Sequence, residues 1–532
     1  MPINVSIGAK WANRIWIYSQ FRAYKQFLRS CKSVIPSQEQ KLAGYLSANA
    51  DTLFGKEYGF ASMRGYGDFA RQLPIQEWED IQPWVERISK GEKAVLTADT
   101  VLAFEETSGS TSASKLIPYT SKLKQEFETG IAPWMVGLYR SHPSAFDGPS
   151  YWSISPATKQ VSHTTSGIPI GLEDDTEYFS PLTRYLLKNI LAIPGEIKNI
   201  GDPHQFYLQT LVHLLSQERL SFVSVWSPSF CLQLDQFLQD HIENILARLH
   251  QQKGLSAQRM RQLNSLLGRR FCWKDLWPDL SVVSCWTDAQ SSLYIPALQK
   301  RIGQEVPIQA KGLLATEGIC SIPLHPQYAP VLTIQSHFYE FRQVESGDIF
   351  RAHELTDGQL YELILTTAGG LYRYATGDLI EINGFFYQAP CFRFVGRKKV
   401  SDLVGEKLSD YQVNEAIQKI FGAYLEEIRC LFLYPRIRSG KSTYVLFLEP
   451  RHARQLSVDP VSLLPAFEQA LAANPYFAQA IQLGQLQTVE CQLLDHGFSD
   501  QLKQYLQTKK KIKDGDWKMP ALFQEGSLYP LL

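Results

Sequence analysis

The segment Leu280–Leu314 constrains the fold more than any other part of the chain. Leu280–Cys285 and Val306–Leu314 are apolar runs typical of buried strands, and Ala289–Ile302 between them has the spacing of a helix. Strand, helix and strand in close succession form a βαβ unit, which requires a parallel sheet with a right-handed crossover. The chain is therefore predicted to belong to the α/β class, with ligands bound beyond the carboxyl ends of its parallel strands.

A polar group follows this predicted sheet edge. Ala315, Thr316 and Glu317 come directly after the second strand. A carboxylate beside a hydroxyl at the end of a strand is well placed to hold Mg²⁺. The same residues also suit a plain turn or a helix cap, so this segment alone leaves both interpretations open.

Hydroxyl side chains crowd the stretch Thr107–Lys115, whose sequence is TSGSTSASK. Short strands are predicted on either side, at Val101–Phe104 and at Leu116–Tyr119, where Pro118 disfavours a helix. Backbone N–H groups, hydroxyls and a terminal lysine are the donors that wrap a phosphate. The pattern differs from the P-loop GxxxxGK[ST], which opens a helix, and a solvated turn is the alternative interpretation.

Close-set β structure is predicted from Gln359 on. The predicted strands, separated by glycine-containing turns, are Tyr361–Thr366, Leu371–Ala375 and Leu379–Ile382. Asp378 follows the turn Thr376–Gly377 in the sequence YRYATGD, where its carboxylate could accept both hydroxyls of a ribose. An aspartate after a glycine is also ordinary turn chemistry, so this residue too has two interpretations.

Charged residues become more frequent and the regular spacing of apolar residues ends at Gly396–Asp402, which is predicted to be a hinge between domains. The chain is thus divided into an N-terminal domain at residues 1–395, a hinge at 396–402 and a C-terminal domain at 403–532. The C-terminal domain is predicted to be a compact α/β unit. Its predicted helices and strands are Tyr411–Phe421, Ile428–Leu433, Tyr444–Leu448, Leu463–Ala473 and Thr488–Leu494.

Composition narrows the class of protein. The 53 basic and 53 acidic residues cancel, which argues against binding to nucleic acid or to an anionic membrane. The eight cysteines show no CxxC or Cys/His spacing, which argues against zinc and for reduced thiols. No signal segment or membrane-spanning run is recognisable, so we expect a cytoplasmic enzyme.

Two helices are predicted before and after the hydroxyl-rich stretch. Ala12–Ser30 has the pattern of a basic amphipathic helix that packs over a core rather than on a membrane. Ser121 is predicted to cap a second helix that ends near Tyr139.

These parts together are what an ATP-dependent adenylating enzyme needs. The chain resembles the adenylate-forming superfamily of acyl-CoA ligases, peptide-synthetase adenylation domains and luciferases. TSGSTSASK resembles the superfamily's phosphate-loop pattern TSG(S/T)TGxPK, YRYATGD its ribose motif and GRKKVSDLVGEKL its hinge. Gly515–Pro520 resembles the stretch that carries the mobile catalytic lysine of the superfamily.

Within that superfamily the chain is most similar to the auxin-responsive Gretchen Hagen (GH-three) family of acyl acid amido synthetases, in its prokaryotic branch. The resemblance runs along nearly the whole chain, in addition to the hydroxyl-rich loop. Its blocks are DTLFGKEYGF at Asp51–Phe60, GEKAVLT at Gly91–Thr97, SCWTDAQSSLYIPALQKRI at Ser284–Ile302, KGLLATEGICSIPL at Lys311–Leu324 and VGEKLSDYQVNEAI at Val404–Ile417.

The resemblance implies a fold as well as an activity. A large N-terminal domain would hold layered sheets with helices and a small β-barrel, and a smaller α/β C-terminal domain would rotate over it. The sequence departs from the family at Ser112 and Ser114, which replace the usual Gly and Pro of the loop. It also departs at Leu313 and Leu314, where plant members carry an aromatic and a small residue beside the adenine.

The resemblance also implies ligands and roles for individual residues. ATP and Mg²⁺ would be bound, with Glu317 holding the metal and Asp378 and Arg397 fixing the ribose. Lys407 or Lys518 would reach the α-phosphate, and the sequence does not rank them. The remaining residues implied to contact the nucleotide are Thr107, Ser108, Gly109, Ser110, Thr111, Ser112, Lys115, Ala315 and Thr316.

The implied reaction joins a carboxylic acid to ATP and then transfers the acyl group to an amine, in this family an amino acid. An acyl-CoA synthetase and a non-catalytic nucleotide-binding protein are the alternatives. The sequence does not identify the base that deprotonates the amine; His163, His325 and His337 are candidates. The acid pocket is expected between Trp226–Phe230 and the helix around residue 130.

Overall fold

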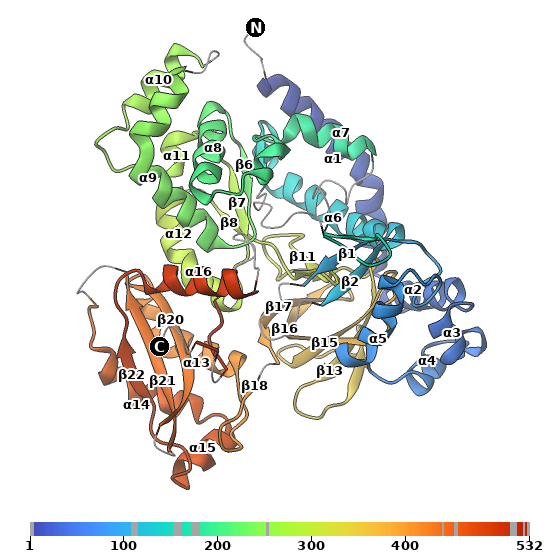
Figure 1. Ribbon diagram of the computed structural model, residues 1–532. Coiled ribbons are helices and arrows are strands. Elements are labelled where there is room, and N and C mark those ends of the chain that lie inside the picture. The colour runs from blue at the N-terminus through green and yellow to red at the C-terminus, as the bar shows by residue number, and fades with distance from the viewer. Residues whose placement is uncertain are drawn as a thin grey trace.

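Figure 1 shows the computed structural model of the chain, coloured from the N-terminus to the C-terminus. It describes residues 5–107, 115–152, 162–171, 181–251, 255–398, 400–438, 441–451, 456–510, 519–524 and 527–528.

Helices form the first hundred residues. The longest, α1 (Val5–Cys31), confirms the predicted amphipathic helix and buries Trp16 and Phe27. Its Asn13 side chain donates to the carbonyl of Gly148 at 3.0 Å, so the helix packs over the core as predicted. The helices that follow are α2 (Val34–Ala48), α3 (Leu53–Glu57), α4 (Tyr66–Gln72) and α5 (Trp78–Ser89).

A four-stranded parallel sheet with the order β3-β6-β7-β8 confirms the predicted βαβ unit. Its strands are β3 (Ser150–Trp152), β6 (Phe222–Ser224), β7 (Val282–Cys285) and β8 (Ile308–Ala310). The helices around it are α8 (Pro203–Ser216), α9 (Pro228–Gln251), α10 (Ala257–Asn264), α11 (Trp273–Leu276) and α12 (Ile295–Ile302). The preceding helix, α7 (Pro181–Ile190), packs against α1 instead. The last strand ends earlier than predicted because Gly312, with φ at 76°, turns the chain against the carbonyl of Ser321.

The strands that flank the hydroxyl-rich loop are paired as predicted. β1 (Val101–Glu106) and β2 (Leu116–Thr120) form an antiparallel hairpin in a sheet completed by β5 (Pro169–Ile170) and β4 (Ser162–His163). The helix α6 (Ser121–Ser141) follows β2 directly. Its cap is Thr120 rather than the predicted Ser121, since the Thr120 hydroxyl accepts from the backbone of Leu123 at 3.1 Å.

The strands between Ser321 and Arg397 form an antiparallel sheet of seven strands, in the part of the fold for which the resemblance implied a small β-barrel. Its strands in spatial order are β11 (Ser321–Ile322), β12 (Val331–Leu332), β17 (Ala389–Arg397), β16 (Tyr374–Phe386), β15 (Leu360–Thr366), β13 (Phe338–Gln343) and β14 (Ile349–Arg351). The prediction of two strands with a turn at Thr376–Gly377 is wrong. One continuous strand, β16, crosses this region, and its register to β15 shifts between Glu362 and Ile364.

The orange and red elements of Figure 1 form a separate C-terminal lobe. The predicted helices and strands are all present, as α13 (Asp410–Phe421), β20 (Ile428–Arg438), β21 (Lys441–Pro450), α14 (Pro460–Leu471) and β22 (Glu490–Leu493). The lobe also contains β18 (Val400–Ser401), β19 (Leu408–Ser409), α15 (Pro475–Gln482) and α16 (Phe498–Lys510). Hydrophobic clusters cover both faces of the sheet β20-β21-β22.

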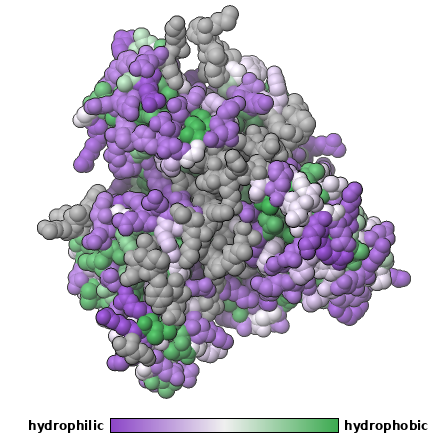
Figure 2. All heavy atoms as spheres, viewed as in Figure 1, coloured by the Kyte–Doolittle hydropathy of each residue, from purple (hydrophilic) through white to green (hydrophobic). Residues whose placement is uncertain are grey.

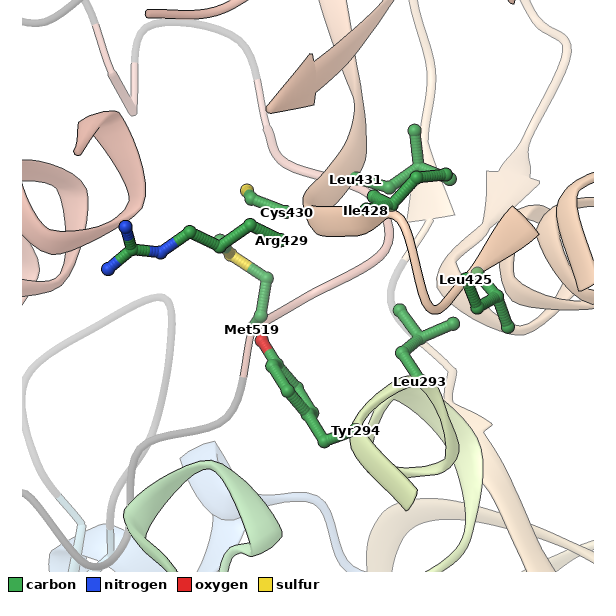
Figure 3. Close-up of a pocket in the computed structure, with 8 residues that line it drawn as sticks. All are labelled: Leu293, Tyr294, Leu425, Ile428, Arg429, Cys430, Leu431 and Met519. Atoms are coloured by element: carbon green, nitrogen blue, oxygen red, sulfur yellow. The ribbon is translucent and has the colours of Figure 1, made fainter. Parts of the chain in front are cut away.

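The C-terminal lobe contacts the rest of the chain through α13 and α16. Gln418 on α13 donates to the hydroxyl of Ser292 at 2.8 Å, and Lys503 on α16 donates to Gln233 on α9 at 2.6 Å. A cavity of about 10 Å³ lies between the two parts. Figure 3 shows its lining residues, with Tyr294 reaching toward Met519. A cavity of this size holds about one water molecule, so the contact is closely packed.

On the face shown in Figure 2, hydrophilic residues cover most of the coloured surface, and hydrophobic ones form small separate groups. None of the helices among the described residues combines the length and the apolar character needed to cross a bilayer.

Candidate active site

The hydroxyl-rich loop begins and ends at the hairpin β1–β2. The backbone N–H of Thr107 donates to the carbonyl of Lys115 at 3.0 Å, which closes the hairpin at the base of the loop. The Lys115 ammonium donates to the Tyr374 hydroxyl at 2.8 Å and lies 5.6 Å from the Trp78 ring centroid. The Thr107 hydroxyl is buried and has no hydrogen-bond partner among the described residues. The predicted phosphate-binding residues Ser108, Gly109, Ser110, Thr111 and Ser112 lie outside the described residues.

Asp378 lies inside strand β16 and is buried, whereas the sequence predicted it at a turn. The predicted turn residue Gly377 has φ at 75° and forms a bulge, where the pairing of β16 with β15 is irregular. A bulge redirects side chains without ending the strand, which explains why turn chemistry appears here. Across the ladder, Arg397 donates through Nε to Asp378 Oδ1 at 3.0 Å. The Asp378 carboxylate in turn raises the pKa of Arg397.

Glu317 occupies the turn of a short hairpin formed by β9 (Leu314–Ala315) and β10 (Gly318–Ile319). Thr316 completes the turn, and its carbonyl accepts from the Tyr119 hydroxyl at 2.6 Å. Burial, and then the nearby Asp378 carboxylate, raise the pKa of Glu317; the charges of Arg397 and Lys115 oppose this rise. Four charged groups from four distant segments therefore lie close enough to act on one another.

His337 holds the Glu317 hairpin in place, a role that the sequence did not reveal. Its Nε2 accepts from the backbone N–H of Ile319 at 3.1 Å, so its Nδ1 is the donor to Glu126 Oε2, also at 3.1 Å. A side chain on Gly318 would approach Nε2 to 2.6 Å, so only glycine fits beside the ring. Both ring nitrogens are thus occupied, and His337 is a positioning residue rather than the base.

The other candidate bases are exposed and lie on different elements. His163 is on β4, and His325 follows β11. The base of the second step therefore stays unassigned.

Of the two lysines predicted to reach the α-phosphate, Lys407 makes no contact with the cluster among the described residues. Lys407 is exposed on the loop between β18 and β19, where its φ of 44° is unusual for a residue with a side chain. The adjacent Glu406 carboxylate accepts from the backbone of Leu403 and Val404, both at 2.8 Å, which fixes this loop. Lys518 lies outside the described residues.

A larger cavity of about 330 Å³ lies at the opposite end of the parallel sheet. It is lined by polar residues such as Asp147, Arg219 and Lys274, and by Leu280 and Ser281, which directly precede β7. It shares no residue with the charged cluster. Since ligands of parallel sheets bind at the carboxyl ends of the strands, this cavity is not the expected substrate site.

Comparison with models of known families assigns the chain to a family. The model of the GH3 family N-terminal domain matches residues 23–308, more than half of the chain, and that of the GH3 family central domain matches residues 330–397. The chain belongs to the GH3 family. The resemblance seen in the sequence is thereby confirmed.

Relatives and solved structures agree with this assignment. Indole-3-acetic acid-amido synthetase GH3.17 of Arabidopsis thaliana is 25% identical over 488 residues, covering 78% of each chain. Probable indole-3-acetic acid-amido synthetase GH3.11 of Oryza sativa subsp. japonica is 26% identical over 438 residues, covering 72% of this chain and 73% of the relative. The solved GH3.15 acyl acid amido synthetase superposes with a TM-score of 0.81 at 20% identity, and the match covers 96% of this chain and 95% of that chain. The predictions of an adenylate-forming α/β fold and of an amide-forming ligase are confirmed.

Proposed function

We propose that this GH3 member adenylates a small carboxylic acid with ATP and Mg²⁺ and then transfers the acyl group to an amino acid in the cytoplasm. The observation that carries the proposal is the cluster at the end of the hydroxyl-rich hairpin. It brings the carboxylates of Glu317 and Asp378 together with the cations of Lys115 and Arg397. A nucleoside triphosphate with its metal requires this pattern, in which carboxylates face the metal and cations face the phosphates.

The described residues fit a divalent cation. Glu317 is buried, lies near a second carboxylate, and forms no ion pair with any described residue. A buried carboxylate without a cation is costly, and Mg²⁺ is usually bound by one or two carboxylates together with phosphate oxygens. Mg²⁺ held by Glu317 would supply positive charge to the phosphate oxygens while pyrophosphate leaves.

The nucleotide is held by groups from three segments. Asp378, oriented by Arg397, accepts the hydroxyls of the ribose. The Thr107 hydroxyl, which has no hydrogen-bond partner among the described residues, and the Lys115 ammonium, at the other end of the loop, donate to the phosphates. Tyr374 fixes the lysine on one side, so its charge is already in place when ATP binds. Such fixed donors contribute about 3–4 kcal/mol each to lowering a barrier in comparable enzymes.

In the first half-reaction the acid's carboxylate oxygen attacks the α-phosphorus, and the bond to pyrophosphate breaks. Negative charge on the phosphate oxygens is balanced by Lys115 and by a lysine of the C-terminal domain, Lys407 or Lys518. In the second half-reaction the amine attacks the acyl carbon of the mixed anhydride, the C–O bond to AMP breaks, and the amide forms. The amine loses a proton in this step.

The C-terminal domain changes position between the two half-reactions. The predicted hinge at 396–402 begins at the end of β17, where Gly396 and Arg397 still pair with Leu379 and Asp378 of β16. Gly396, with φ at 155°, packs against the backbone of Tyr411 at the start of α13. Rotation here would withdraw the C-terminal lysine and admit the amine, as lids and hinges do in other multistep enzymes.

The decisive experiment is pyrophosphate–ATP exchange with a panel of carboxylic acids. Exchange that depends on one class of acid, followed by amide products with amino acids in mass spectrometry, supports the proposal. Thioester products with coenzyme A instead would identify an acyl-CoA synthetase. Absence of exchange with every acid, in a protein that still binds ATP, would identify a nucleotide-binding protein without this activity.

A further inference from the structure

Lys311 lies at the carboxyl edge of the parallel sheet, where substrates of such sheets bind. It is the first residue after β8, and its backbone N–H donates to the carbonyl of Cys285 at the end of β7, at 3.1 Å. Trp286 and Trp226 follow the neighbouring strands β7 and β6, and the backbone N–H of the first donates to the carbonyl of the second at 2.8 Å. Three residues with large side chains therefore extend the sheet at this edge.

The Lys311 side chain is buried without a carboxylate partner. Its exposed fraction is 3%, and it forms no ion pair with any residue in the described part of the chain. The ammonium donates to the Ser224 hydroxyl at 2.6 Å and lies 4.9 Å and 4.8 Å from the ring centroids of Trp134 and Trp226. An ammonium has three N–H donors, so this geometry leaves two for other acceptors. Burial lowers the pKa of Lys311 to about 7.

A row of polar side chains runs beside the lysine across three strands. Ser224, Ser284 and Gln309 are aligned neighbours on β6, β7 and β8, so their side chains share one face of the sheet. The Trp134 indole N–H donates to Gln309 Oε1 at 3.1 Å, which places α6 over the same face. The Ser284 hydroxyl, in the middle of the row, is fully buried and has no hydrogen-bond partner among the described residues.

Buried polar groups without partners are costly, and each calls for an explanation such as a bound water, ion or ligand. Here a lysine with two unused donors and a serine without a partner lie together on one sheet edge. The side chains of Trp226 and Gln309 are only partly buried, so the group can be approached from their side. The tryptophan rings offer flat apolar surfaces suited to an aromatic ligand.

We propose that Lys311, with the hydroxyls of Ser224 and Ser284, binds a hydrogen-bond acceptor on the tail of the acid substrate. The protein would thus select aromatic acids that carry a hydroxyl or a second carboxylate remote from the carboxylate that is adenylated. This proposal rests on the proposed function, because it assigns the acid's tail to this site. It also accounts for the expected pocket between residue 226 and the 130s helix.

A hydroxyl and a second carboxylate on the ligand differ in how they affect the protonation of the Lys311 side chain. A second carboxylate favours the charged form of Lys311, so its binding near pH 8 draws a proton from solution. The neighbouring titratable groups are Cys231 on α9 and Cys285 on β7, and burial raises the pKa of both thiols, so they stay neutral there. A hydroxyl accepts a hydrogen bond from either form of the amine, and its binding takes up little or no proton.

The test compares benzoate with the isomeric hydroxybenzoates and benzenedicarboxylates. Pyrophosphate–ATP exchange gives kcat/KM for each acid, and quenching of tryptophan emission gives binding without any reaction. The variants are Lys311→Met, which keeps the volume, and Lys311→Gln, which keeps a donor without charge. Lys122→Met, at an exposed position on α6, is the matched control.

We expect wild-type protein and the Lys122→Met control to favour one acceptor-bearing isomer over benzoate by about tenfold or more, as one hydrogen bond to a charged group allows. Lys311→Met should bring this ratio close to one. Lys311→Gln should keep the preference for a hydroxyl and lose that for a carboxylate. Calorimetry in two buffers of different ionisation enthalpy should show proton uptake with dicarboxylates, and none in either Lys311 variant.

The outcomes separate this inference from the proposed function. Exchange with an unchanged preference in Lys311→Met overturns the inference and leaves the function standing. Selective quenching that is lost in Lys311→Met, without exchange for any acid, supports the inference and overturns the function. Neither exchange nor selective quenching with any member of the panel overturns both.

Discussion

Lys311→Met should stabilise the protein, and the gain should shrink as pH rises. Lys311 is buried between Trp134 and Trp226, and the Ser224 hydroxyl is the hydrogen-bond partner of its ammonium. Desolvation therefore favours its neutral form, and its pKa falls from the ordinary 10.5 to about 7. Methionine has a similar volume and no charge, so it should fill the same space without that cost.

The magnitude follows from the difference between the two pKa values. Between pH 7 and 10.5 the unfolded wild type holds a proton at this residue that the folded protein has released, so wild-type stability rises with pH in this interval. Each pH unit is worth about 1.4 kcal/mol, and the whole interval is worth roughly 5 kcal/mol. Below pH 7 both states are protonated, and the advantage of the variant stays constant. The variant lacks the group, so its stability has no such component.

The assay is thermal unfolding of the two proteins in matched buffers from pH 6 to pH 9. All other titrating groups are common to both proteins, so their contributions cancel in the difference between the two Tm values. We expect Lys311→Met to melt several degrees higher at pH 6 and to lose a little over half of that advantage by pH 9. Lys122→Met should show no such pH dependence. A difference between Lys311→Met and wild type that is flat across this range would refute a buried lysine with a lowered pKa.

Four further predictions concern the active site. Glu317→Gln should raise the Tm of the ligand-free protein, because it removes a like-charge neighbour of Asp378. The same variant should lose the additional stabilisation that Mg²⁺–ATP gives the wild type. If that stabilisation is retained across a magnesium titration, Glu317 is a structural residue. Asp378→Ala should weaken ATP binding in calorimetry by tenfold or more, about the loss of one charged hydrogen bond, and unchanged affinity would exclude a ribose contact. Gly318→Ala should cost about 1–3 kcal/mol and slow exchange, because the added carbon meets His337 at 2.6 Å, whereas Gly44→Ala, with open space around it, should not. Lys518→Ala should cripple acyl-adenylate formation but leave the conversion of a pre-made acyl-adenylate to amide near normal; equal loss in both steps would instead indicate a folding defect.

Local sequence was sufficient for elements whose signal lies in consecutive residues. The parallel βαβ unit and the strands on either side of Thr107–Lys115 follow from apolar runs and from the turn residues that bound them. The turn predicted before Asp378 failed for a physical reason. A glycine with positive φ is compatible with a turn and with a bulge, and only the pairing of β16 with its neighbour β15 decides between them.

Long-range contacts could not be predicted in this way. Glu126 and His337 are 211 positions apart, and Lys115 and Tyr374 are 259 apart. No spacing rule links such residues, because the contact exists only once two separate sheets and α6 are packed. Lys311 is a further case. A lysine after an apolar run is typical of an exposed strand end, and its burial depends on tryptophans from α6 and from the end of β6.

The geometry of α6 explains how one fold can position two substrates at once. Glu126 and Trp134 lie on this helix eight residues apart, which is about 12 Å along its axis. Through His337, Glu126 holds the hairpin that carries Glu317, on the nucleotide side. Trp134 contacts Gln309 and Lys311 on the side proposed for the acid. The chain from Lys311 to Glu317 connects the same two places, so a shift of α6 would displace the proposed site of the acid's tail and the proposed metal ligand together. Under the proposed function, a single packed unit would thus align the reacting carboxylate with the α-phosphorus, and the C-terminal domain would need only to deliver and withdraw its lysine.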